Sequence, residues 1–224
     1  MSARAAVFDV DGTLADTNHL HTVCWWEALR QAGHHVPMVS VLGAIGLGSS
    51  DLLEHLLGKE RDRDQDATIS AAHKTLYATW YERIAPFEGA ADLLRRLHDD
   101  GWPVVLATSA GGPELAALRS AIDADEAITA TASSDDVTEG KPAAEPVRHA
   151  LDLAQAEPQG SVFVGDSVWD MQAGRRAGVI PVGVLSGGVS RAELEKAGAV
   201  EVYADTADLL RGLERSAFGR RHRD

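Results

Sequence analysis

Short runs of apolar and β-branched residues alternate with longer amphipathic segments along most of the chain, and this alternation constrains the fold more than any other feature. The runs lie at residues 6–8, 103–107, 127–131, 161–164, 180–184 and 200–203. Continuous apolar runs of this length are typical of strands that are buried on both faces. The segments between them have helical periodicity, at residues 91–99, 114–121, 146–154, 170–177, 191–196 and 208–213. We therefore expect an α/β fold with a doubly wound parallel sheet.

One segment interrupts the alternation. Residues 16–84 contain no convincing strand and predict three helices, at 18–31, 51–57 and 68–83. A crossover between parallel strands needs only about a dozen residues, so most of this segment is an insertion. We predict a helical cap domain at residues 16–84 and a catalytic core made of residues 1–15 and 85–224. Ligands of open α/β sheets bind outside the carboxyl ends of the strands, where this insertion could act as a lid.

The ends of the cap helices carry recognisable signals. Asn18 is a candidate N-cap for the first helix, and Ser49 or Ser50 is one for the second. Gly58 follows the second helix and predicts its end.

Composition excludes several classes of protein. The 224 residues carry 34 acidic and 21 basic side chains, for a net charge of −13, which disfavours nucleic acid as a partner. No apolar run approaches the roughly 18 residues of a membrane span. The single Cys24 excludes an internal disulfide framework. We expect a cytoplasmic protein without nucleic-acid or membrane partners, and we interpret the basic residues 220–223 as a solvated tail.

Polar and charged residues follow the apolar runs. Asp9 and Asp11 come after the first, and Thr108 and Ser109 after the second. Farther along the chain, Lys141 stands between a glycine and a proline, and Asp166 and Asp170 follow the run at 161–164. Because the carboxyl ends of parallel strands meet at one edge, we expect these side chains to converge.

Structural roles compete with this interpretation for some of these residues. Asp9 and Asp11 could cap the turn that follows them, as aspartate often does. Asp170 could serve as an acid at a helix N-terminus. If Asp166 and Asp170 instead share one helical face at i and i+4, they repel each other unless a cation lies near.

The four motifs together resemble those of the haloacid dehalogenase superfamily. Asp9-Val10-Asp11-Gly12-Thr13 is similar to its first motif, Thr108 to its second, Gly140-Lys141-Pro142 to its third, and the stretch from Gly165 to Asp170 to its fourth. The segment after the first motif resembles the helical cap of the phosphoglycolate phosphatase and β-phosphoglucomutase branch. The resemblance covers nearly the whole chain and implies a Rossmann-like core.

This resemblance implies a mechanism and a set of residue roles. The nucleophile is Asp9, which forms an aspartyl-phosphate, and Asp11 is the general acid and base. The cofactor is Mg²⁺, and the phosphoryl oxygens are held by the protein. The implied metal ligands are Asp9, the backbone carbonyl of Asp11, and Asp166, with Asp170 as an outer contributor; the implied phosphate-binding residues are Gly12, Thr108, Ser109 and Lys141.

Within the family, the sequence favours a phosphatase. The acid at position 11 argues against the dehalogenase branch. The cap lysines, Lys59 and Lys74, suit a solvated surface better than the Schiff base of the phosphonatase branch. A β-phosphoglucomutase-like mutase remains an alternative, although the cap loop at 46–50 has no arginine for a second phosphate. A non-catalytic binding or regulatory protein on the same fold is the alternative from another class.

The substrate is expected to be a small phosphorylated metabolite. The cap residues predicted to face the cleft form a polar set of modest volume: His19, His21, Trp25, Leu47, Ser49 and Ser50. A phosphorylated sugar or hydroxy acid suits this set better than a nucleotide or a protein. The sequence leaves the oligomeric state open between monomer and dimer.

Overall fold

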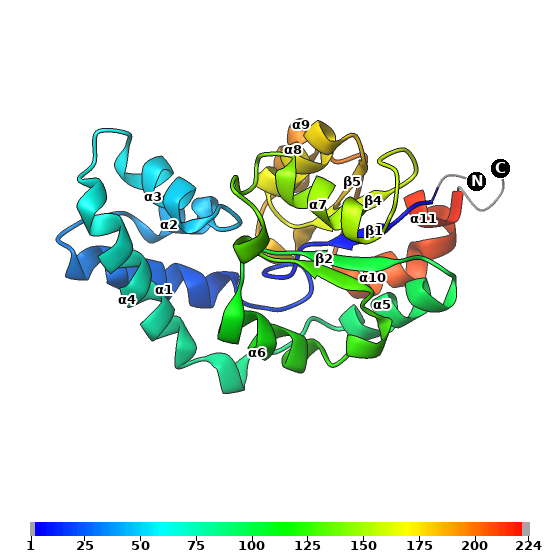
Figure 1. The fold of residues 1–224 in the computed structure, drawn as a ribbon, viewed down its shortest axis with the longest axis horizontal. Coiled ribbons are helices and arrows are strands. Elements are labelled where there is room, and N and C mark those ends of the chain that lie inside the picture. Colours follow the sequence, from blue (N-terminus) through cyan, green and yellow to red (C-terminus); the bar gives the residue numbers. More distant parts are fainter. Residues whose placement is uncertain (1–2, 221–224) are drawn as a thin grey trace.

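A six-stranded parallel sheet forms the centre of the protein. The structure is a computed structural model, and residues 3–220 are described. The strands are β1 (Ala6–Phe8), β2 (Val104–Ala107), β3 (Ala130–Ala132), β4 (Val162–Gly165), β5 (Ile180–Val184) and β6 (Glu201–Tyr203). Their order is β3-β2-β1-β4-β5-β6, and every pairing is parallel. The predicted doubly wound α/β fold is therefore confirmed (Figure 1).

Helices cover both faces of this sheet. One face carries α7 (Glu145–Leu153), α8 (Val168–Ala177) and α9 (Arg191–Ala197). The other carries α5 (Ala90–Asp99), α6 (Gly112–Ile122), α10 (Thr206–Gly212) and α11 (Ala217–Arg220). In Figure 1 the first group lies above the sheet, α5, α6 and α10 lie below it, and α11 lies at its right-hand end.

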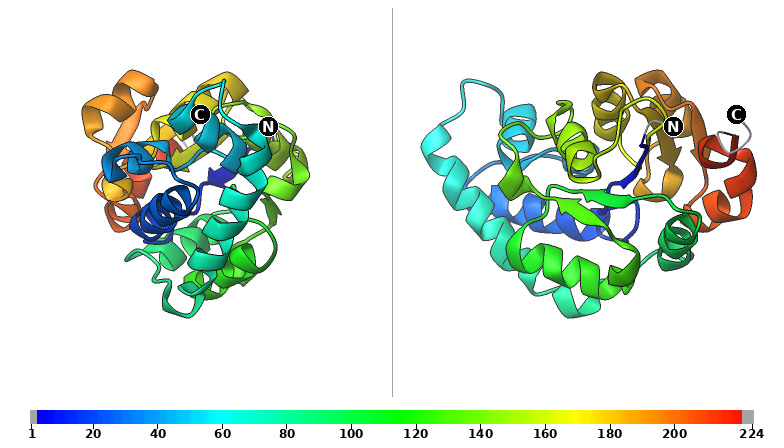
Figure 2. Two further views of the ribbon diagram at one scale, coloured as in Figure 1. Left: turned by 90° about the vertical axis from the view of Figure 1, so that its left-hand side faces the viewer. Right: turned by 45° about the vertical axis from the view of Figure 1, so that its right-hand side comes forward.

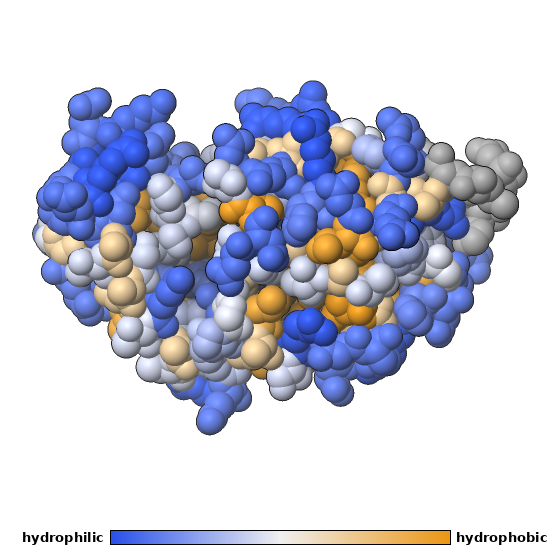
Figure 3. Space-filling model, viewed as in Figure 1, coloured by the Kyte–Doolittle hydropathy of each residue, from blue (hydrophilic) through white to orange (hydrophobic). Residues whose placement is uncertain are grey.

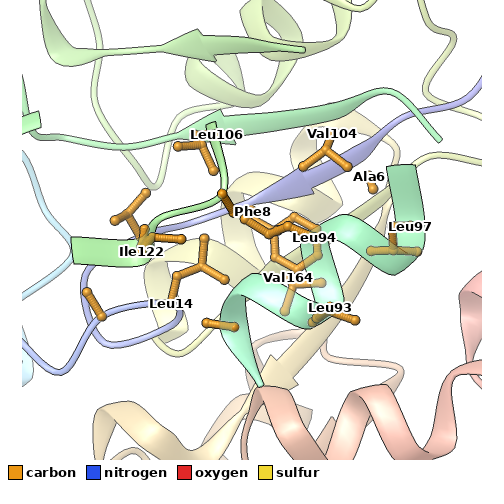
Figure 4. Packing of buried hydrophobic residues seen from close by; sticks show 14 of the residues in the cluster. Ala6, Phe8, Leu14, Leu93, Leu94, Leu97, Val104, Leu106, Ile122 and Val164 are labelled. Atoms are coloured by element: carbon orange, nitrogen blue, oxygen red, sulfur yellow. The ribbon is translucent and has the colours of Figure 1, made fainter. Parts of the chain in front are cut away.

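Alternate residues of β1 belong to different hydrophobic clusters. Phe8 packs with Leu94 of α5 and Ile122 of α6, all fully or almost fully buried (Figure 4). Val7 packs on the opposite face with Val147 of α7. Since successive side chains of a strand point to opposite faces, a central strand with both faces covered must be apolar throughout.

The segment between β1 and α5 is helical and has its own core. It contains α1 (Asn18–Gln31), α2 (Met38–Ala44), α3 (Ser49–Leu57) and α4 (Asp66–Ala78), which lie at one end of the molecule (Figures 1 and 2). A separate hydrophobic cluster joins these helices through Leu29, Val41, Leu53 and Ile69. Figure 3 shows hydrophilic residues over the outer end of this segment, where the charged connection from α3 to α4 lies.

Two chain segments connect the helical part to the sheet, and they lie side by side. The backbone N–H of Asp16 donates to the carbonyl of Ala85 at 2.9 Å, and that of Phe87 donates to Leu14, also at 2.9 Å. The division into a cap domain (residues 16–84) and a core (residues 1–15 and 85–224) stays a prediction. We propose that the boundary between the two domains lies at this paired crossing.

Several predicted elements differ from the structure. Helix α2 was not predicted, and the predicted helix at 68–83 divides into α4 and a short 3₁₀ turn at Tyr81–Arg83. The Thr79 hydroxyl donates to the carbonyl of Leu76, a local bond that competes with continuing the helix. The predicted strand at 127–131 is displaced to β3, because Asp125–Ala127 form a 3₁₀ turn.

The predicted N-caps were also wrong. The N-cap of α1 is Thr17, and Asn18 is the first helical residue. The N-cap of α3 is Gly48, without a side-chain hydrogen bond, and Ser49 opens the helix. Gly58 does end α3, with φ of 86°.

No helix among residues 3–220 is long and apolar enough to cross a membrane. Cys24 is buried and carries a free thiol. Of the basic tail at 220–223, residues 221–223 lie outside the described residues.

Candidate active site

The carboxyl ends of the three central strands bring the predicted motif residues together. Asp9 follows β1, Thr108 follows β2, and Asp166 follows β4. Since β1 pairs with both β2 and β4, these three residues lie at neighbouring positions along one edge of the sheet. The backbone N–H of Asp9 continues the ladder by donating to Val164 at 2.9 Å.

Lys141 lies among the aspartates. Its Nζ donates to Oδ1 of Asp9 at 2.6 Å and to Oδ1 of Asp170 at 2.8 Å, and only 2% of the residue is exposed. Burial lowers the pKa of Lys141, but the charges of Asp170 and Asp9 outweigh burial and raise it. The ammonium group therefore stays charged and neutralises part of this edge.

Three buried carboxylates share the site with that single ammonium. Oxygens of Asp9, Asp166 and Asp170 all lie within 4.8 Å of one another. Burial, and then the charge of Asp170, raise the pKa of Asp9 well above its usual value and the pKa of Asp166 to about 7. Excess negative charge on hard oxygen donors is the environment that a divalent cation stabilises.

The Asp166 carboxylate is oriented by two donors. Thr13 Oγ1 donates to its Oδ1 at 2.9 Å, and Asn18 Nδ2 donates to its Oδ2 at 2.8 Å. The remaining amide oxygen of Asn18 is buried and has no hydrogen-bond partner within the described part of the chain. An unpaired acceptor beside a group of carboxylates suits a cation that retains bound water. The residues present therefore fit a divalent metal site.

Asp170 has a structural role as well. It is the third residue of α8, and its Oδ2 accepts from the hydroxyl and the backbone N–H of Ser167 in a capping box. Asp166 lies outside the helix, so the expected pair at i and i+4 on one helical face was wrong. The two carboxylates approach each other because the strand end and the first helical turn are adjacent.

Gly12 allows the chain to turn tightly under the carboxylates. Its φ is +77°, and a Cβ there would lie 2.3 Å from Asn18 Nδ2 and 2.4 Å from Asp166 Oδ2. The Ser186 hydroxyl donates to its carbonyl at 2.7 Å. Only glycine is compatible with both the backbone conformation and the space.

The second motif follows β2 at the same edge of the sheet, and Ser109 lines the cleft whereas Thr108 does not. Thr108 is buried, and its Oγ1 accepts from the N–H of Ala110 at 3.1 Å. Ser109 is exposed and lines the cleft. The hydroxyl of one residue and the backbone of the next thus reach the same edge of the sheet.

Asp11 turns toward the helical segment, away from Lys141. Its Oδ1 accepts from Thr17 Oγ1 at 2.6 Å and lies 3.1 Å from His21 Nε2. Burial raises the pKa of Asp11, but the charge of His21 and hydrogen bonds from His21 and Thr17 bring it below its usual value. For His21, burial lowers the pKa and the charge of Asp11 raises it, with a net increase. Each group therefore stabilises the charged form of the other.

His73 of α4 supports this pair and was missed from the sequence. Its Nε2 lies 3.1 Å from His21 Nδ1, and burial followed by the charge of His21 lowers the pKa of His73 to about 2. A neutral His73 can accept a hydrogen bond from Nδ1–H of His21, while Nε2 of His21 faces Asp11. The rings of Trp25 and His73 stack with centroids 4.1 Å apart, and those of His21 and Tyr77 with centroids 3.9 Å apart.

A cleft of about 400 Å³ opens above these groups, between the helical segment and the sheet edge. The predicted cap residues His21, Trp25 and Ser49 line it, as does Leu47. The prediction was wrong for His19 and Ser50, which are exposed and lie outside its lining.

Other residues of the lining were not predicted. Glu114, on the first turn of α6, lies 3.6 Å from His21 Nε2. Burial raises the pKa of Glu114 to about 7, against the opposing charge of His21. Lys74, Tyr81 and Asp135 also face the cleft. Glu114 lies on the first turn of a helix that begins just after the second motif, but its approach to His21 depends on packing that leaves no pattern in the sequence.

Comparisons with known proteins agree with this arrangement. Residues 3–178 match the family model for haloacid dehalogenase-like hydrolases. The chain is 28% identical to a phosphoglycolate phosphatase of Neisseria gonorrhoeae, over 82% of this chain and 80% of the relative. It is also 28% identical to the pyrophosphatase PpaX of Anoxybacillus flavithermus, over 82% and 84% of the two chains. The crystal structure of a hydrolase from Pseudomonas syringae aligns with a TM-score of 0.89 and 32% identity, covering 95% of this chain and 98% of that one.

Proposed function

Because the chain belongs to the haloacid dehalogenase-like hydrolases, we propose that it is a Mg²⁺-dependent phosphatase that acts on a small phosphorylated metabolite through an aspartyl-phosphate. The observation that carries this proposal is the buried cluster in which Asp9, Asp166 and Asp170 face one charged lysine. Two relatives are named phosphoglycolate phosphatase and pyrophosphatase, and both names denote hydrolysis of a phosphate compound. The two relatives are equally similar to this chain, but their names denote different substrates. They therefore do not identify the leaving group of its substrate.

Asp9 is the proposed nucleophile. An oxygen of its carboxylate attacks phosphorus, the P–O bond to the leaving group breaks, and the phosphoryl group becomes attached to Asp9. Water then attacks the same phosphorus, the bond to Asp9 breaks, and inorganic phosphate leaves. The hydrogen bond from Lys141, 2.6 Å long, fixes the Asp9 carboxylate and balances its charge.

Asp11 is the proposed acid and base, and its pairing with His21 supplies the proton. The leaving oxygen must gain a proton as its bond to phosphorus breaks, and the attacking water must lose one. His21 Nε2 lies 3.1 Å from Asp11 Oδ1, close enough to exchange a proton with it. We expect Asp11 to pass this proton to the leaving oxygen and to recover one from the water.

The phosphoryl oxygens would be bound by Lys141, the Thr108 hydroxyl, the Ser109 N–H and the backbone at Gly12. Asn18 and Asp166 can approach the Gly12 backbone closely because this residue has no side chain. Donors fixed in a water-poor site stabilise the charge that develops on these oxygens.

Mg²⁺ would be held by Asp9, the Asp11 carbonyl and Asp166, with Asp170 as an outer contributor. When bound, the ion neutralises the repulsion between Asp9 and the phosphate and polarises the phosphoryl group. Asp170 is already engaged with Lys141 and Ser167, which supports its outer role.

A phosphomutase would need a second phosphate site near the cap. Among the described residues that line the cleft, Lys74 is the one lysine or arginine, and it is exposed. This single cation favours a phosphatase over a mutase. The complete set of motif residues likewise favours an enzyme over a non-catalytic binding protein.

A substrate panel tests the proposal. The purified protein is incubated with Mg²⁺ and small phosphate esters, including p-nitrophenyl phosphate and an anomeric glucose phosphate, and both free phosphate and isomerised sugar phosphate are measured. Release of phosphate that stops on chelation of Mg²⁺ is expected. Isomerisation without net phosphate release would make the protein a mutase, and no turnover by the folded protein would support a binding role.

A further inference from the structure

Glu114 lies where the leaving group must pass. The phosphoryl group is proposed to sit over Asp9, while Asp11, which protonates the leaving oxygen, points toward the helical segment. The leaving group therefore extends into the part of the cleft between Asp11 and the cap. Glu114 lines that part, and its side chain is only 14% exposed.

The charged side chains in this part of the cleft differ in how deeply they are buried. Asp9 and Asp11 pair with Lys141 and His21; the other carboxyl and ammonium groups that line the cleft within the described part of the chain are those of Glu114, Asp135 and Lys74. Lys74 and Asp135 are exposed and are therefore screened by water. Glu114 is mostly shielded from water, and because burial raises its pKa to about 7 it is fully ionised only above that pH. There its charge acts on a ligand more strongly than the screened charges do.

The Glu114 carboxylate also has room to accept hydrogen bonds. Its nearest charged partner, His21 Nε2, is 3.6 Å away, beyond a normal hydrogen bond. Within residues 3–220, neither oxygen of the Glu114 carboxyl group accepts a hydrogen bond. A hydroxyl of the leaving group can donate to such an acceptor, whereas a carboxylate or a second phosphate cannot and is repelled.

We propose that Glu114 makes this enzyme selective for phosphate esters of uncharged, hydroxyl-bearing leaving groups, such as polyols or sugars, and that it disfavours phosphorylated acids and bisphosphates. The inference rests on the proposed phosphatase activity. It separates the two substrate classes that the sequence left open, since a hydroxy acid would bring its carboxylate beside Glu114. It also sets this chain apart from relatives named phosphoglycolate phosphatase.

Matched pairs of esters test this selectivity. Terminal glycerol phosphate and phosphoglycerate differ only in a hydroxymethyl group against a carboxylate, and hydroxyethyl phosphate and phosphoglycolate differ in the same way. At about pH 8.5, where Glu114 is ionised, we expect kcat/KM of the wild-type enzyme to favour the alcohol in each pair by about tenfold or more, as expected for like charges brought together in a cleft. Equal or better hydrolysis of the acids would overturn the proposal.

Variants of Glu114 locate the cause. Glu114→Gln keeps the size, removes the charge and should narrow the alcohol-to-acid ratio; Glu114→Lys should reverse it. Glu157→Lys makes the same change of charge at an exposed residue that precedes β4, at the opposite end of the sheet, and should leave the ratio unchanged. A ratio that stays the same in both Glu114 variants would overturn the proposal, even if overall activity falls.

p-Nitrophenyl phosphate separates this inference from the function on which it rests. If the wild-type enzyme hydrolyses that ester but prefers phosphorylated acids, only the role of Glu114 fails. If it hydrolyses no ester in the presence of Mg²⁺, the proposed phosphatase activity itself fails.

Discussion

Asn18 shows how one side chain can serve the site without belonging to a motif. It begins α1, yet its amide bonds Asp166, which follows a strand far along the chain. Its other amide atom is a buried acceptor without a partner within the described residues. A side chain placed in this way orients the carboxylate proposed to bind the metal, and its free oxygen could accept a hydrogen bond from a metal-bound water.

We predict that Asn18→Ala weakens Mg²⁺ binding by about 10- to 100-fold, the usual effect of removing a group that orients a ligand. Isothermal titration of the substrate-free protein with Mg²⁺ measures this directly. His19→Ala is the matched control, because His19 is the exposed neighbour and does not line the cleft. Equal Mg²⁺ affinity of Asn18→Ala and the wild type would contradict this role.

Gly12 is constrained twice, by its φ of +77° and by the atoms that surround it. Gly12→Ala should therefore lower the free energy of unfolding more than Gly33→Ala does, since Gly33 has a similar φ of +86° but open space around it. Left-handed backbone alone costs about 1–2 kcal/mol in each variant. Urea unfolding compares the two, and equal losses would show that the contacts with Asn18 and Asp166 do not matter.

At the residue scale, the sequence could predict the positions of residues that depend only on their place directly after a strand. The placement of Asp9, Thr108 and Asp166 follows from their positions after apolar runs that become neighbouring strands. Glu114 and His73 could not be predicted in this way, because their roles depend on how α6 and α4 approach His21 in space.

At the scale of elements, the helical segment depends on packing among its own helices. Leu29, Leu53 and Ile69 come from three different helices and are buried together. This cluster is distinct from the two clusters that flank the sheet. The segment therefore has a hydrophobic core of its own, joined to the sheet by the paired crossing of residues 14–16 and 85–87.

We predict that Leu53→Ala lowers the free energy of unfolding by about 2–5 kcal/mol, because Leu53 is 0% exposed and its removal leaves a cavity. Val39→Ala in the same segment should change it by less than about 0.5 kcal/mol, since Val39 is 76% exposed. Thermal or urea unfolding of both variants provides the comparison. A small loss for Leu53→Ala would mean that this cluster contributes little to stability.

Strands and long helices were predictable because their apolar periodicity is strong. β1, β5 and α1 have the predicted bounds. Helix α2 and the N-caps could not be predicted, because α2 is short and Gly48 caps α3 without a side-chain hydrogen bond. The break between α4 and Tyr81–Arg83 likewise depends on local bonds that leave no pattern in the sequence.

At the scale of the whole molecule, the strand edge and the helical segment form the walls of one cleft. The protein carries a net charge of −13, and the site itself has more carboxylates than ammonium groups. A phosphorylated ligand is therefore bound against the general field of the protein, by Lys141 and the proposed Mg²⁺ at one point. On this proposal, activity requires the metal, and the charges that line the cleft determine selectivity among substrates.

The most direct test of the account is the activity of Asp9→Asn. The amide keeps the shape of the buried side chain but cannot attack phosphorus, so phosphate release from p-nitrophenyl phosphate with saturating Mg²⁺ should fall by at least about a thousandfold. Circular dichroism should show that the variant remains folded. Activity within a few-fold of the wild type would contradict the assignment of Asp9 as the nucleophile, and with it the aspartyl-phosphate mechanism.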